Sequence, residues 1–152
     1  MNRAELVAVL YRLEGKPAMS GDMHFSDVNA GQAYSDAILW ASQKGIIGGY
    51  GNGKFGSNDP ATREQAIVML YRYAKYKGLD VSASGDLSGF VDADKISGWA
   101  LDAMKWAVAV GIVQERPGSK TAPKDSSTRA ETAMIFKRYI EDYLGEGDDS
   151  EE

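Results

Sequence analysis

The strongest constraint on the fold is an internal repeat. Three segments begin alike, with NRAE at 2–5, TREQ at 62–65 and TRAE at 128–131. Two longer matching segments, residues 25–50 and 90–115, lie between them. Each of these begins F-x-D and carries a tryptophan followed five residues later by a glycine. A chain that repeats one plan at this spacing is expected to fold as successive copies of one supersecondary unit.

Each copy is predicted to contain two helices. Apolar residues at helical spacing surround Trp40 and Trp106, which we expect in the core, and the first helix should end at Gly45 or Gly111. The loops that follow are rich in turn-forming residues, and the repeated segment then starts a second helix with one apolar face. Helices with a single apolar face pack on other helices, so the prediction is an all-α fold with loop-rich connections.

The repeated segments also predict how the second helices begin. A cap residue followed three positions later by Glu or Gln forms a capping box, in which each residue bonds the other's backbone N–H. The predicted pairs of cap and partner are Asn2 with Glu5, Thr62 with Gln65, and Thr128 with Glu131.

The repeat sets the expected domain boundaries. Residues 1–19 read as the second half of a first repeat, 20–79 as a second repeat and 80–144 as a third, and 145–152 read as an acidic disordered tail. The first repeat is expected to be truncated, since only its second helix is present. The truncation would leave apolar surface uncovered, which could support self-association.

Composition excludes several functions. The formal net charge of −5 argues against nucleic-acid binding, which requires a basic face. There are no cysteines, so neither a disulfide nor a thiolate metal site can form. No apolar run is long enough for a membrane span, and no signal peptide is visible. We expect no cofactor and no metal.

An arginine follows each cap, at Arg3, Arg63 and Arg129. A cation at a helix start is unfavourable because the helix dipole is positive there, so each arginine needs a negative partner. One interpretation is an ion pair between repeats, with Asp27, Asp92 or Asp59 as the partner. The other is an anion site, in which free backbone amides and a guanidinium bind a carboxylate beside the loop at 49–61.

These residues resemble the S-layer homology (SLH) repeat of bacterial surface proteins. The resemblance rests on F-S-D-V, A-I-x-W-A-x-x-x-G-I-I-x-G-Y, G-N-G-x-F, N-D-P-A-T-R-E and T-R-A-E, which occur in this order. It covers the chain from Asn2 to about Leu144.

The resemblance implies a pseudo-threefold helical spindle at the bacterial cell wall or S-layer. Such modules anchor proteins non-covalently to a secondary cell-wall polysaccharide, often through a pyruvate ketal on an N-acetylmannosamine-type sugar. Carried over to this chain, the glycan-binding residues would be Arg63, Arg129, Arg3, Trp99, Gly49, Asn52 and Gly53. Ala33 stands where the third repeat has Trp99, and Gln114-Glu115 replaces the Gly-Tyr pair, so the sites should be unequal.

Two other classes of function are alternatives to a wall-binding module. An enzyme is not expected, because the only histidine, His24, lies in a linker and no nucleophile or catalytic dyad can be assembled. Asp27 and Asp92 read as helix caps rather than as a glycosidase pair. The remaining alternative is a self-association or protein-interaction module that binds no glycan.

Overall fold

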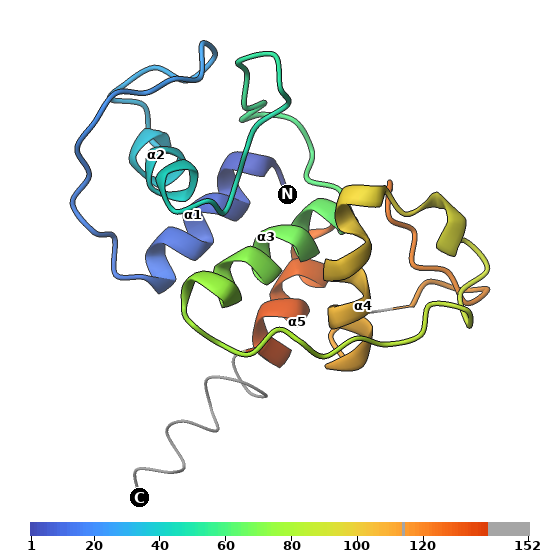
Figure 1. The fold of residues 1–152 in the computed structure, drawn as a ribbon. Helices are drawn as coiled ribbons and strands as arrows, with labels where there is room; N and C mark the ends of the chain where they lie inside the picture. Colours follow the sequence, from blue (N-terminus) through green and yellow to red (C-terminus); the bar gives the residue numbers. More distant parts are fainter. Residues whose placement is uncertain (114, 140–152) are drawn as a thin grey trace, which may run out of the picture. The chain divides into compact units, whose positions relative to one another are not determined.

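A computed structural model describes residues 1–113 and 115–139. The predicted acidic tail at 145–152 lies outside these residues. In the described part of the chain the secondary structure is helical, with three isolated β-bridges and no strand, which confirms the all-α prediction (Figure 1). The elements are α1 (Arg3–Leu13), α2 (Ser35–Gln43), α3 (Arg63–Tyr76), η1 (Ala93–Lys95), η2 (Gly98–Ala100), α4 (Leu101–Ala109) and α5 (Arg129–Tyr139).

The chain forms two compact units. The first unit contains residues 1–61 and 69–80, and the second contains 62–68 and the chain from Val81 onward. Helix α3 therefore contributes its first residues to the second unit and its later residues to the first. The pseudo-threefold arrangement stays a prediction.

The core of the first unit is built around Trp40. Helices α1 and α2 pack against each other (Figure 1). Trp40 is fully buried, and its ring lies 5.7 Å from that of Tyr11 and 6.3 Å from that of Tyr73. Trp106 is its counterpart in the second unit and is also fully buried. Both tryptophans serve the core, as their helical spacing predicted.

All three capping boxes are formed. The N–H of Glu5 donates to Asn2 Oδ1 (2.8 Å) and the N–H of Asn2 donates to Glu5 Oε1 (3.1 Å). The same reciprocal bonds join Thr62 to Gln65 (3.2 and 3.0 Å). Thr128 and Glu131 form the third box (3.0 and 3.0 Å).

The first helix of each repeat ends at the expected glycine. Gly45 and Gly111 have φ of 74° and 80°, conformations that cost glycine little. The following N–H groups, of Ile46 and Ile112, donate back to carbonyl groups of α2 and α4 (2.8 and 3.0 Å). These are the bonds of a Schellman C-cap.

The capping role expected for Asp27 and Asp92 is wrong. Helix α2 starts only at Ser35 and α4 only at Leu101, and neither start has a side-chain cap. The two carboxylates instead accept hydrogen bonds from the loop that follows in the same repeat. Asp27 binds the N–H groups of Phe55 (2.9 Å) and Gly56 (2.8 Å).

Asp92 repeats this arrangement in the second unit, where it accepts from the N–H groups of Thr121 (2.8 Å) and Ala122 (2.8 Å). Burial alone would raise the pKa of Asp92, but these backbone hydrogen bonds bring it below its usual value. The aspartate of the F-x-D motif thus fastens the loop.

No helix in the described ranges combines the length and the apolar character that crossing a membrane requires.

Candidate functional site

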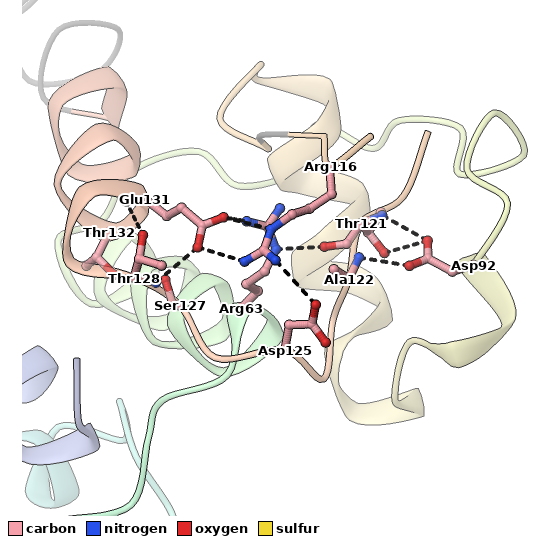
Figure 2. A network of polar contacts seen from close by, with 10 residues as sticks. All are labelled: Arg63, Asp92, Arg116, Thr121, Ala122, Asp125, Ser127, Thr128, Glu131 and Thr132. Atoms are coloured by element: carbon pink, nitrogen blue, oxygen red, sulfur yellow. Dashed lines mark hydrogen bonds and ion pairs between the residues drawn. The ribbon is translucent and has the colours of Figure 1, made fainter. Parts of the chain in front are cut away.

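Two of the three arginines that follow a cap, Arg3 and Arg63, hold a loop in place. In the second unit Arg63 is 5% exposed, and its Nε donates to the carbonyl oxygen of Thr121 (2.8 Å) (Figure 2). Its own N–H donates to the carbonyl oxygen of Asp125 (2.8 Å), and the N–H of Glu64 donates to that of Pro123 (3.1 Å). Side chain and backbone together attach the start of α3 to the loop of the third repeat.

The first unit contains the same attachment. Arg3 Nε donates to the carbonyl oxygen of Phe55 (3.0 Å). The N–H groups of Arg3 and Ala4 donate to the carbonyl oxygens of Asp59 (2.9 Å) and Ser57 (3.1 Å). The expectation of free amides at these helix starts is therefore wrong for α1 and α3, because loop carbonyls already accept from them.

The two buried guanidinium groups are stabilised differently. Arg63 Nη1 pairs with Glu131, which also binds Arg116 through two hydrogen bonds (3.1 and 3.0 Å) (Figure 2). Burial would raise the pKa of Glu131, but the bonds from Arg116 and Thr128 and the charge of Arg63 lower it. The ion-pair interpretation thus holds for Arg63, with Glu131 in place of the three aspartates considered.

Arg3 has aromatic neighbours instead. Its guanidinium carbon lies 4.6 Å from the ring centroid of Tyr50 and 4.7 Å from that of Phe55, both within cation–π range. The hydroxyl of Tyr50 donates to Asp59 Oδ2 (2.7 Å). Burial lowers the pKa of Arg3, and the charges of Tyr50 and Asp59 oppose that shift.

The other predicted site residues are not among the loop residues that Arg3 and Arg63 bind. Arg129 is exposed at the start of α5, and Trp99 is 58% exposed in η2. Gly49 and Gly53 adopt φ of 73° and 81° in the loop of the second repeat. Asn52 Oδ1 accepts from the N–H of Lys54 (3.0 Å) in that loop. A glycan contact by any of the seven predicted residues stays a prediction.

A basic groove of about 220 Å³ opens beside the loop of the third repeat. Its lining residues are Asp92, Lys95, Lys120, Ala122, Pro123, Lys124 and Asp125. Lys95 and Lys120 are exposed, and neither forms an ion pair with any residue that the structure describes. Three lysines against two aspartates give the lining a net positive charge.

Lys124 connects this groove to the turn that carries Trp99. Its Nζ pairs with Glu64 Oε2 (3.0 Å) and also bonds Ser97 Oγ. Ser97 immediately precedes η2, so the exposed indole lies two residues from a group that contacts the groove lysine. The arrangement places an aromatic face and ammonium groups in one region of the second unit.

A second groove, of about 430 Å³, lies in the first unit. It is lined by Ala8, Tyr11, Arg12, Lys16, Ala18, Ala33, Tyr34, Asp36 and Ala37. Arg12 and Lys16 are exposed and make no ion pair within the described ranges. Ala33 occupies the position of Trp99, which leaves room between α1 and the start of α2.

Sequence reasoning missed the basic residues that line both grooves, and Glu64 and Arg116 as well. Only Glu64 had a local signal, because TREQ has a glutamate where NRAE and TRAE have alanine. Lys95 lies in η1, and Lys120 and Lys124 lie in the loop of the third repeat. No repeated motif singles out these lysines.

Comparisons with known proteins agree with this architecture. The S-layer homology domain family matches the chain at residues 24–67 and 89–133, together more than half of its length. An amylopullulanase of Thermoanaerobacterium thermosulfurigenes is 34% identical over 145 residues, and this match covers 93% of the chain. The surface-layer 125 kDa protein of Lysinibacillus sphaericus is 34% identical over 80% of the chain. The exoglucanase XynX of Acetivibrio thermocellus is 33% identical over 93% of it.

The similarity covers only 8%, 10% and 13% of these three relatives, respectively. Two of them are enzymes and one is a surface-layer protein, so what they share is a module rather than an activity. The matched residues contain both F-x-D segments, both tryptophan helices and the helix starts at Arg63 and Arg129. The chain belongs to the S-layer homology domain family of cell-surface proteins, whose domains anchor surface proteins to the cell wall.

Proposed function

We propose that this chain binds an acidic cell-wall polysaccharide, through a pyruvate ketal, in the basic groove of the second unit. The observation that carries the proposal is the pair of exposed lysines, Lys95 and Lys120, that have no ion-pair partner in the described chain. The carboxylate of a pyruvate ketal would supply the negative charge with which these two ammonium groups can form an ion pair.

The neighbouring groups suit a sugar. Trp99 offers an exposed aromatic face, and such faces stack on the apolar side of a pyranose ring. The groove volume of about 220 Å³ is below the ~300–1,000 Å³ typical of sites for drug-sized ligands, so it suits one sugar and its substituent. Longer stretches of polymer would continue along the surface.

The buried arginines have an indirect part in this proposal. Arg63 holds Thr121, which lies next to groove residues Lys120 and Ala122, and thereby shapes the groove without reaching solvent. Arg129, which is exposed, is the arginine of the three that we expect to touch the polymer directly.

Binding to purified cell-wall sacculi, with and without chemical removal of the ketal, tests the proposal. The double variant Lys95→Ala, Lys120→Ala should lose most of its binding to untreated sacculi. The double variant Lys44→Ala, Lys75→Ala is the matched control, since it removes two exposed lysines outside the groove.

Equal binding by the two double variants, or equal binding to treated and untreated sacculi, would overturn the proposal. Light scattering on the purified protein, without sacculi, tests the separate prediction of self-association through the first repeat.

A further inference from the structure

The residue that follows the arginine at each helix start is charged in only one of the three repeated segments. The residue after the arginine is Ala4 in α1 and Ala130 in α5, but it is Glu64 in α3. The register is secure for the first two, because the N–H groups of Ala4 and Glu64 donate to loop residues at the same repeat position, Ser57 and Pro123. A glutamate therefore occurs where the other repeats have a methyl group.

Glu64 is buried and fully bonded. Its side chain is 1% exposed, and Oε1 accepts from the N–H of Ser97 (3.0 Å). Both carboxylate oxygens accept from Lys124 Nζ, at 3.4 Å for Oε1 and 3.0 Å for Oε2. A buried carboxylate costs free energy unless it is paired and hydrogen-bonded, and both conditions are met here.

The partners of Glu64 are peculiar to the same unit. Lys124 corresponds to Asn58 in the second repeat, because their neighbours Asp125 and Asp59 accept equivalent backbone bonds. Ser97 corresponds to Gly31, in the register that aligns Trp99 with Ala33. The first unit thus has Ala4, Asn58 and Gly31 where the second has Glu64, Lys124 and Ser97.

Together these contacts tie a groove lysine and the tryptophan turn to one carboxylate. Electrostatics alone would make Glu64 a disadvantage, since a carboxylate next to an anion site repels the ligand. Its benefit is geometric, because one carboxylate fixes two groups. It holds the ammonium of Lys124 through an ion pair, and it holds the start of η2 through the N–H of Ser97. A ligand then meets groups that are already ordered.

We propose that Glu64 is a positioning residue of the basic groove, which fixes Lys124 and the Trp99 turn for binding an acidic sugar. This inference rests on the proposed function. It adds a residue that neither contacts solvent nor belongs to the repeat's common pattern.

The test uses the variants Glu64→Gln and Glu64→Ala with two readouts. One is calorimetric affinity for the methyl glycoside of pyruvylated N-acetylmannosamine. The other is acrylamide quenching of tryptophan fluorescence, which reports Trp99 because Trp40 and Trp106 are 0% exposed. Circular dichroism verifies that each variant is folded.

Glu64→Gln should bind the sugar about tenfold more weakly, the change expected for one lost hydrogen bond to a charged group. Its quenching should match that of the unchanged protein, because the amide oxygen still accepts from Ser97. Glu64→Ala should lose affinity and also show stronger quenching. The double variant Glu64→Ala, Lys124→Asn should bind no worse than Glu64→Ala, because the lysine is already released.

Unchanged or tighter binding by Glu64→Gln would overturn the proposal. If Glu64 only offset the positive charge of the groove, removing its charge would tighten the binding of an anion. If the unchanged protein does not bind the glycoside, the proposed function fails. The quenching comparison would still decide the positioning role, and equal quenching of Glu64→Ala and the unchanged protein would refute it.

Discussion

At the scale of single residues, the two loops show how one backbone conformation tolerates different side chains. Ala122 has a φ of 47°, and its counterpart Gly56 has a φ of 78°. Both N–H groups bind the aspartate of the F-x-D motif. The conformation is left-handed in both loops, and an L-residue with a Cβ pays for it.

Ala122→Gly should therefore stabilise the protein by about 1 kcal/mol, because it removes the left-handed strain. Gly56→Ala should destabilise it. A Cβ there would lie 2.5 Å from Tyr50 Cε2 and 2.6 Å from Asp59 Oδ2. Urea denaturation of the two variants should give shifts of opposite sign, and shifts of the same sign would contradict this account.

Arg63→Lys should destabilise the protein by about 2 kcal/mol, since lysine lacks the Nε–H that bonds Thr121 and the planar group that reaches Glu131. Arg129→Lys makes the same exchange at an exposed helix start and serves as the control. Thermal melting compares them. If the two variants melt at the same temperature and only Arg63→Lys loses wall binding, this account is wrong and Arg63 contacts the ligand directly.

At the scale of elements, the segment between α3 and η1 is attached to α4 by a close backbone approach. The N–H of Gly85 donates to the carbonyl oxygen of Lys105 (2.8 Å). A Cβ on Gly85 would lie 2.9 Å from Val108 Cγ1 and 3.0 Å from the backbone nitrogen of Ala109. Two residues further on, Leu87 is buried, so the segment contributes to the core of the second unit.

Gly85→Ala should cost about 1–3 kcal/mol, the usual range for overpacking, because helix backbone cannot move away from the new methyl group. Gly89→Ala is the matched control, since a Cβ there has no atom within 4 Å. Urea denaturation measures both. A loss of stability no larger for Gly85→Ala than for Gly89→Ala would show that the contact with α4 is dispensable.

The helix starts show which features of a helix can be predicted from a few neighbouring residues of the sequence. A capping box joins residues three apart, so its two partners are visible in any stretch of four residues. The F-x-D segment misled us for the opposite reason. Asp27 and Asp92 resemble caps locally, yet their partners lie 28 to 30 residues away in the loops.

At the scale of the whole molecule, three hydrogen-bonded carboxylates make stability depend on pH. Burial opposes but does not cancel the hydrogen bonds that lower the pKa of Asp27, Asp92 and Glu131. A folded-state pKa below the unfolded value means that the unfolded chain binds protons more readily. The stabilisation is complete above the unfolded pKa and is lost as the pH falls through the folded one.

We therefore expect the urea midpoint to drop as the pH falls below about 5, where unfolded carboxylates begin to bind protons. Glu131→Gln should reduce the difference in midpoint between neutral and acidic buffer, because the amide keeps the capping box but cannot titrate. Asp102→Asn, at an exposed position, should leave the difference unchanged. A Glu131→Gln difference as large as that of the unchanged protein would refute the assignment.

Sequence patterns were enough to predict the helices, their caps and glycine ends, the buried tryptophans and the family. Each of these depends on short-range periodicity, on partners a few residues apart, or on motifs that recur in order. The tertiary structure alone decided what the arginines bind, because Arg63 reaches Thr121 and Glu131 across 58 and 68 residues. It also decided that Lys95, Lys120 and Lys124 line one groove. Side chains from separate loops converge only after the chain has folded, and no local pattern encodes that convergence.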